Sequence, residues 1–247
     1  MKTPLTYIVF ARTPRLGQGK TRLASDIGAE AAFMLYEAML VDTLHTISMR
    51  NAASVLLFAF PPEAESVQEM EAWCKAHQCW FPELCVLPQT GATLGEQMYR
   101  AFCSAFETSP HPAIILGTDS PTIPHRIWDA AEEALQTSNS AVLGRSSDGG
   151  FYAMGLSGVD ESLFFGNAYS NDTVYARTHA ALQGFFSTVL ELPEWTDIDD
   201  LASLGRVLRE ARTREEAHEY ELVKRIEELQ ANKLFPSEQR ELLRSLL

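Results

Sequence analysis

The side chains best suited to chemistry lie in one short basic segment near the start of the chain, residues 12–22. Glycines there would let backbone N–H groups approach an anion, and lysine and arginine would form charge-assisted hydrogen bonds to phosphate oxygens. The segment follows an apolar run, residues 7–11, and precedes residues 24–49, which we expect to be helical. A strand, a basic loop and a helix in this order are typical of a phosphate-binding site. The cations and glycines are Arg12, Arg15, Gly17, Gly19, Lys20 and Arg22.

The same segment contains Gly19-Lys20-Thr21, which looks like the end of a Walker A motif. That motif requires a glycine five residues before its second glycine, and this chain has Pro14 at that position. Proline has a fixed φ and no N–H to donate, so we exclude a P-loop. The alternative, a basic loop that is only solvated, is less attractive because the rest of the chain is acidic.

Polar residues follow four further predicted strands, at the point where each strand ends. In an open α/β sheet, ligands bind beyond the carboxyl ends of the strands, so these residues should gather with the basic loop. A diphosphate needs cations and N–H donors, whereas Mg²⁺ or Mn²⁺ needs oxygens, commonly from one or two carboxylates and from phosphate. The combination predicts a site for a nucleotide and a divalent metal. The residues are Gln89, Gly91, Asp119, Asp148, Asp197 and Asp199.

Each aspartate also has a simpler structural interpretation. Asp119 could cap the helix that opens near Pro121, and Asp148 could be a turn residue because two glycines follow it. Asp199 and Asp200 could cap the helix that follows them. Asp119 is our first choice of metal ligand, because its place directly after a strand should hold it rigidly.

The elements that must position these residues alternate between strands and helices. This alternation predicts a mainly parallel sheet with helices on both faces, and the absence of a helix within 141–156 predicts that the sheet is mixed there. Thr93 is the expected N-cap of a helix, with Glu96 at its N3 position. No strand is expected after residue 201, where helices are predicted at 215–229 and 237–246. The predicted strands are 7–11, 53–60, 84–87, 113–116, 141–144, 151–156 and 186–192, and the other predicted helices are 63–79, 94–107, 123–135 and 171–182.

Composition limits the classes of function. The chain has 247 residues and a net charge of −13, which argues against nucleic-acid binding and against docking on an anionic membrane surface. No apolar run approaches the ~20 residues that span a bilayer, and the N-terminus has no signal-peptide pattern, so we expect a cytoplasmic protein without a membrane span. The four cysteines match neither a zinc nor a redox spacing and are expected to be reduced.

Five segments of the chain form an ordered set of motifs. They are residues 10–24, Gln89-x-Gly91-x-x-Leu94-Gly95-Glu96, Leu116-Gly-Thr-Asp119-Ser-Pro121, Leu143-Gly…Asp148-Gly-Gly-Phe-Tyr152 and Asp197-Ile-Asp199…Leu201. Over residues 5–205 the set resembles a bacterial family of nucleotide-diphospho-sugar transferases, also described as selenodomain- or radical-SAM-associated transferases. The Lys-Thr-Arg-Leu loop is similar to that of phospholactate guanylyltransferases. The chain departs from the family pattern at Arg12, where lysine is usual, and at Gly19, where valine is common.

The resemblance implies an α/β fold, a GT-A-like and Rossmann-related α/β/α sandwich with a mainly parallel, partly mixed sheet. The GT-A-like domain would cover residues 1–205. Residues 206–247 lie outside the resemblance, and their own sequence predicts a C-terminal helical extension that packs back on the domain or makes a homodimer contact. Asp119 would take the metal-ligand role of the GT-A aspartate motif, although Asp119-Ser-Pro is not a literal Asp-x-Asp. Lys20 and Arg22 would lie near the nucleotide phosphates. Mg²⁺ or Mn²⁺ is the implied cofactor.

Three functions remain open from the sequence. The first is a glycosyltransferase that uses a nucleoside diphosphate sugar, a divalent metal and an unknown acceptor. The second is a guanylyltransferase-like nucleotidyltransferase that uses a nucleoside triphosphate and releases pyrophosphate, and the third is a non-catalytic nucleotide-binding protein. We assign catalysis to Asp148 and Asp197 and metal binding to Asp119 and Asp199. The nucleotide- or phosphate-binding residues are expected to be Ala11, Arg12, Gly17, Lys20, Arg22, Gln89, Gly91 and Thr118.

Overall fold

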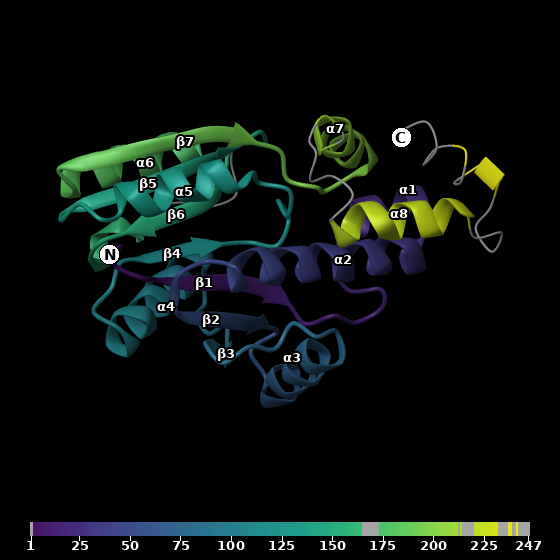
Figure 1. Ribbon diagram of the computed structural model, residues 1–247, viewed down its shortest axis with the longest axis horizontal. Helices are drawn as coiled ribbons and strands as arrows, with labels where there is room; N and C mark the ends of the chain where they lie inside the picture. Colours follow the sequence, from purple (N-terminus) through teal and green to yellow (C-terminus); the bar gives the residue numbers. More distant parts are fainter. Residues whose placement is uncertain are drawn as a thin grey trace. The chain divides into compact units, whose positions relative to one another are not determined.

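The chain divides into two compact units, each built from segments that are separate in the sequence. The computed structural model describes residues 2–164, 173–211, 213, 220–231, 237–238 and 241, and Figure 1 traces its helices and strands. The sheet unit consists of Met1–Thr13, Ile47–Thr118 and Ile123–Trp195. The helical unit consists of Pro14–Thr46, Asp119–Thr122 and Thr196–Leu247. The chain therefore passes from the sheet unit into the helical unit shortly after the first, fourth and seventh strands, and it returns to the sheet unit at residues 47 and 123.

The sheet unit contains one seven-stranded sheet in the order β3-β2-β1-β4-β6-β5-β7. Strand β6 runs antiparallel to both of its neighbours, and all other neighbouring strands are parallel. This arrangement confirms the predicted mainly parallel sheet, with its mixed part at 141–156. The strands are β1 Leu5–Arg12, β2 Ala52–Phe60, β3 Leu84–Pro88, β4 Ala113–Leu116, β5 Ser140–Ser146, β6 Phe151–Leu156 and β7 Thr188–Trp195.

Helices of the sheet unit occupy most of the ranges that the sequence predicts. The Thr93 side chain accepts a hydrogen bond from the backbone N–H of Glu96, which confirms the expected N-cap. The prediction for 171–182 begins outside the described residues, and the helix there runs to Phe185. The helices of this unit are α3 Ala64–Ala76, α4 Leu94–Thr108, α5 His125–Ala134 and α6 Val174–Phe185, with a 3₁₀ turn, η1, at Glu161–Leu163.

The helical unit corrects one prediction. Residues 24–49 do not form a single helix, because the chain breaks at Gly28, whose φ of 87° ends the first helix. The first helix, α1, has only seven residues and begins earlier than predicted, at Thr21. Much of the predicted tail, including most of 237–246, lies outside the described residues. The helices of this unit are α1 Thr21–Ile27, α2 Ala29–Ser48, which continues two residues past the boundary, α7 Leu201–Ala211 and α8 Glu221–Ala231.

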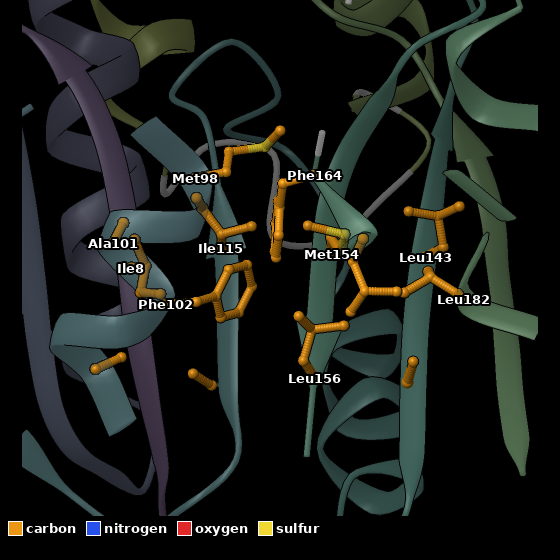
Figure 2. Packing of buried hydrophobic residues seen from close by; sticks show 14 of the residues in the cluster. Ile8, Met98, Ala101, Phe102, Ile115, Leu143, Met154, Leu156, Phe164 and Leu182 are labelled. Carbon is orange, nitrogen blue, oxygen red and sulfur yellow. The ribbon is translucent and has the colours of Figure 1, made fainter. Parts of the chain in front are cut away.

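Each unit has its own apolar core. In the sheet unit, alternate strand residues such as Ile115 and Leu143 share one face because side chains alternate along a strand, and α4 packs Phe102 into the same cluster (Figure 2). In the helical unit, Leu23 and Ile27 of α1 are fully buried. They belong to a cluster that also includes residues of α2, α7 and α8 together with Ile198.

Helix α8 begins at a buried carboxylate that another helix supplies. Asp42 of α2 is 5% exposed and accepts hydrogen bonds from the backbone N–H groups of Glu221 and Leu222, at 2.7 and 2.9 Å. The first N–H groups of a helix lack partners within the helix, and Asp42 accepts from two of them, so this carboxylate acts as a cap from outside. Burial raises the pKa of Asp42 to about 7, against the lowering effect of the two N–H groups.

We expect Asp42→Asn to change how stability depends on pH. Between about pH 4 and pH 7 the folded protein holds a proton on Asp42 that the unfolded chain has lost, so raising the pH should lower the free energy of unfolding. From pH 5 to pH 8 the wild type should lose roughly 1–3 kcal/mol relative to Asp42→Asn. Urea unfolding at both pH values measures this difference. The exposed Asp160→Asn serves as the control, and equal pH profiles for wild type and Asp42→Asn would contradict the expectation.

A second prediction concerns the close approach of β5 and β6. A Cβ atom added at Gly144 would lie 2.3 Å from the buried ring of Tyr152, whose hydroxyl donates to the carbonyl of Pro193. Gly144→Ala should therefore lower the free energy of unfolding by about 1–3 kcal/mol through overpacking. Gly184→Ala on α6 is the matched control, because nothing lies within 4 Å of its added Cβ. Thermal or urea unfolding of both variants tests the difference.

Candidate functional site

The candidate site of the helical unit is built around the ammonium group of Lys20. Its Nζ lies 2.7 Å from Oδ1 of Asp119 and 3.2 Å from Oδ1 of Asp199. It also donates to the backbone carbonyl of Ile198, at 2.5 Å. An ammonium group has three N–H donors, so these three oxygens can use all of them. The Lys20 side chain is only 7% exposed, whereas the side chains of Asp119 and Asp199 are 45% and 37% exposed, so the cation is largely desolvated and the carboxylates are not.

The loop before α1 holds Lys20 in an uncommon backbone conformation. Gly17 and Gly19 have φ values of 79° and 86°, and Lys20 itself has φ 46° and ψ 39°. A left-handed conformation costs a non-glycine residue about 1–2 kcal/mol. The carbonyl of Lys20 then accepts from the N–H of Ala24 and begins α1. This geometry turns the chain so that the lysine side chain contacts the carboxylates, while Arg22, two residues further on, remains 76% exposed.

The two consecutive aspartates before α7, Asp199 and Asp200, have different roles. Asp200 is the cap of α7: its carboxylate accepts from the N–H and hydroxyl of Ser203, both at 2.7 Å. These hydrogen bonds lower the pKa of Asp200. The Asp199 carboxylate instead pairs with Lys20 and lies 4.0 Å from Nη1 of Arg22. The capping alternative therefore holds for Asp200, and the side chain of Asp199 faces the candidate site.

Asp197 and the segment Asp119–Thr122 are joined by hydrogen bonds that the sequence did not indicate. The hydroxyl of Ser120 donates to the carboxylate of Asp197. The N–H of Ile198 donates to the carbonyl of Asp119, at 2.8 Å. Ser120 lies inside one of the recognised motifs, so its position was visible, but its partner is 77 residues away. No local pattern could have indicated the carbonyl of Ile198, because every residue carries one.

The other predicted site residues belong to the sheet unit, at or after the carboxyl ends of parallel strands. Ala11 and Arg12 end β1, and the Arg12 guanidinium lies over the ring of Phe60, 4.9 Å from its centroid. Thr118 follows β4 and is buried. Because β1 and β4 are parallel neighbours, these residues lie together at the carboxyl ends of the two strands. Their assignment to nucleotide binding stays a prediction.

The loop after β3 is braced by side-chain amides. Gln89 is nearly buried and donates to the side chain of Gln97, which in turn donates to the carbonyl of Gly91. Gly91 has φ 141°, and an added Cβ would lie 2.8 Å from the backbone nitrogen of Gln97. Glycine is required here by both conformation and space. Within the described structure, Gln89 therefore has a clear role in holding the loop, and ligand binding by Gln89 and Gly91 stays a prediction.

Asp148 occupies the turn between β5 and β6. Its Oδ1 accepts from the N–H of Gly150, at 2.9 Å, and the turn includes Gly149 with φ 93°. This hydrogen bond is the turn role that the sequence already offered as an alternative. It leaves the proposed catalytic role of Asp148 as a prediction, since a carboxylate can hold a turn through one oxygen.

The oxygen atoms around Lys20 are of the kinds that bind a hard divalent cation. Asp119 and Asp199 supply carboxylate oxygens, and Mg²⁺ is commonly held by one or two carboxylates with phosphate and water completing the shell. Among the described residues no cluster of three or more His, Cys, Asp or Glu side chains is placed to hold a metal by itself. The pair Asp119 and Asp199 therefore fits a metal that shares its coordination with a substrate. Gly17 lies in the same loop, and nothing would meet a Cβ there within 4 Å.

Comparisons with known proteins show which family and which solved structures this chain is similar to. A family model described as "Uncharacterized protein conserved in bacteria (DUF2064)" matches residues 43–171. The structure of a "putative nucleotide-diphospho-sugar transferase" from Desulfovibrio desulfuricans G20 is 25% identical, with TM-score 0.83, over 98% of this chain and 97% of that one. This similarity confirms the fold and the family resemblance given by the motifs. No curated protein matches the sequence.

Two further solved structures have lower similarity. A homolog of Mycobacterium tuberculosis rv0371c from Mycobacterium sp. strain JC1 is 11% identical over 85% of this chain and 98% of that one, with TM-score 0.47. The 4-diphosphocytidyl-2C-methyl-D-erythritol synthase of Anaerococcus prevotii DSM 20548 is 10% identical over 77% and 87%, also with TM-score 0.47. Within the described part of the chain, no helix is both long and apolar enough to cross a membrane. The cytoplasmic location stays a prediction.

The buried ammonium leads to a prediction about stability. Lys20→Met should lower the free energy of unfolding by about 1–3 kcal/mol, because it leaves two neighbouring carboxylates and a carbonyl without their donor. Arg22→Met removes the same charge from an exposed position and should change stability by about 0.5 kcal/mol or less. Urea unfolding of the two variants at pH 7 provides the comparison. Equal effects would mean that the Lys20 contacts contribute little to the folded state.

Proposed function

This chain belongs to the DUF2064 family, and on that premise we propose that it is a glycosyltransferase that uses a nucleoside diphosphate sugar with a divalent metal. Its fold is that of a nucleotide-diphospho-sugar transferase-like protein. The name of the Desulfovibrio desulfuricans protein supports the substrate class. The observation that carries the proposal is the meeting of Lys20 with Asp119 and Asp199, residues that come from three different motifs of the sequence.

The charges in this site favour a metal-assisted phosphate ligand. Ion pairs join two carboxylates to two cations, and a third carboxylate is linked to the same part of the helical unit through Ser120, so the summed formal charge of these groups is negative. A diphosphate would be repelled by this group alone, whereas a divalent cation would reverse the balance. The carboxylates are Asp119, Asp197 and Asp199, and the cations are Lys20 and Arg22.

Asp119 and Asp199 would hold the metal through their carboxylate oxygens. When bound, a divalent metal neutralises charge that grows on a departing diphosphate. Arg22 is exposed, and its Nη1 lies 4.0 Å from Oδ2 of Asp199, so its guanidinium can bind a phosphate oxygen without first losing a buried partner. The structural hydrogen bond from Ser120 holds Asp197 in a defined orientation. We propose Asp197 as the base that takes the acceptor proton, and the assignment of Asp148 to catalysis stays a prediction.

We predict that Mn²⁺ increases the affinity of the protein for one class of nucleoside diphosphate sugar by about tenfold or more. Titration calorimetry with uridine, guanosine, adenosine, cytidine and thymidine diphosphate sugars, with and without Mn²⁺, tests this. Asp119→Asn should abolish the gain from metal, because an amide is a weaker metal ligand than a carboxylate. Asp160→Asn, in an exposed cap of η1, should retain it.

The products separate the remaining functions. Release of a nucleoside diphosphate in the presence of an acceptor supports the glycosyltransferase. Release of pyrophosphate from a nucleoside triphosphate would replace it with the nucleotidyltransferase. Binding without turnover of either nucleotide type, across a broad acceptor panel, would favour a nucleotide-binding protein without catalysis.

A further inference from the structure

The Lys20 ammonium lies in an environment built from metal-type ligands. It is surrounded by two carboxylate oxygens and one backbone carbonyl oxygen, from Asp119, Asp199 and Ile198. Carboxylates and backbone carbonyls are also the protein ligands of hard divalent cations. The side chain of the cation is 7% exposed, while the carboxylates of Asp119 and Asp199 are 45% and 37% exposed. The cation thus lies deeper than the oxygens that hold it.

A divalent metal and this ammonium could not share the same oxygens. A metal bound between Asp119 Oδ1 and Asp199 Oδ1 would lie within a few ångströms of Nζ, where two positive charges repel strongly in a poorly solvated site. The lysine side chain is a flexible four-carbon stem that can turn without moving the backbone. Leu23 and Ile27 keep α1 buried in the core of the helical unit, so the side chain is the part of Lys20 that can move.

We propose that Lys20 is an internal counter-cation that exchanges with the divalent metal on Asp119 and Asp199. Without metal, the ammonium neutralises the two carboxylates. Metal binding releases the ammonium, which then becomes available to a phosphate group. The first step concerns the metal alone, whereas delivery of Lys20 to a phosphate rests on the proposed function.

The exchange makes metal and nucleotide binding cooperative. A phosphate that attracts Lys20 removes the competitor of the metal, and a metal that displaces Lys20 supplies a cation to the phosphate. By thermodynamic linkage each ligand must raise the affinity of the other by the same factor. The arrangement also prevents a strong metal site from forming in the protein without nucleotide, because the ammonium must first be displaced.

The direct test is the chemical reactivity of Lys20 in the wild-type protein. Reductive methylation followed by peptide mass spectrometry reports the reactivity of each lysine. Lys20 should be protected in the metal-free protein and should react several-fold faster with saturating Mn²⁺ and no nucleotide. Lys75, which is 58% exposed, is the internal reference and should not respond. Unchanged protection of Lys20 at a Mn²⁺ concentration that saturates the protein would overturn the proposal.

A second test uses metal affinity, measured by electron paramagnetic resonance of free Mn²⁺ without nucleotide. Lys20→Met should raise the Mn²⁺ affinity by about tenfold or more, since one adjacent opposite charge changes the proton affinity of a carboxylate by about ten- to a thousandfold. Arg22→Met removes an exposed charge 4.0 Å from Asp199 and should raise it much less. Equal effects of the two variants, or no Mn²⁺ binding to either, would reject the exchange.

Experiments with added nucleotide distinguish failure of this inference from failure of the proposed function. Adding uridine or guanosine diphosphate with Mn²⁺ should protect Lys20 again, because a phosphate now covers it. If Mn²⁺ displaces the Lys20 ammonium but no nucleoside diphosphate binds, the proposed function is rejected and the counter-cation role of Lys20 is retained. If nucleotide binds but Lys20 stays protected throughout a Mn²⁺ titration without nucleotide, the proposed function is retained and the exchange is rejected.

Discussion

The ion pair at Lys20 is the constraint on which the helical unit depends. That unit is assembled from three stretches of chain that are far apart in the sequence. Lys20 comes from the first stretch, Asp119 from the second, and Asp199 and the Ile198 carbonyl from the third. The N–H of Ile198 adds a backbone hydrogen bond to Asp119. The Lys20 cation and the backbone of Ile198 therefore connect all three stretches.

The energetics of this pairing indicate a role beyond stability. Removing an ammonium group from water is costly, and well-packed apolar residues often replace a buried ion pair without loss of stability. Lys20 in addition holds a left-handed backbone conformation. A desolvated cation, an unfavourable backbone conformation and two half-exposed carboxylates are an energetically costly way to connect three stretches of chain. They make a suitable device for binding charged ligands, where differences in electrostatic energy are large.

The sheet unit contributes differently, because several of its strands end on the same side of the sheet and are followed there by defined loops. Strands β1, β3, β4 and β5 point the same way, so the loops that follow them begin at a common edge. Two of these loops are held by local hydrogen bonds: side-chain amides brace the loop at Gly91, and an aspartate side chain closes the turn at Gly150. The chain enters the helical unit from strands of this sheet. Residues in the loops therefore start from positions fixed by strand pairing.

The sequence by itself determined the strands, most helices and the identity of the charged residues. Apolar runs such as 53–60 and 113–116 need no distant partner to be recognised, and the Thr93 cap is a contact across three residues. Tertiary structure decided the rest. Gly28 breaks a helix that its neighbours alone would continue, and Asp200 rather than Asp199 caps α7. Lys20 finds its carboxylates 99 and 179 positions away, and charge pairing over such distances depends on how the segments fold together, which local pattern does not encode.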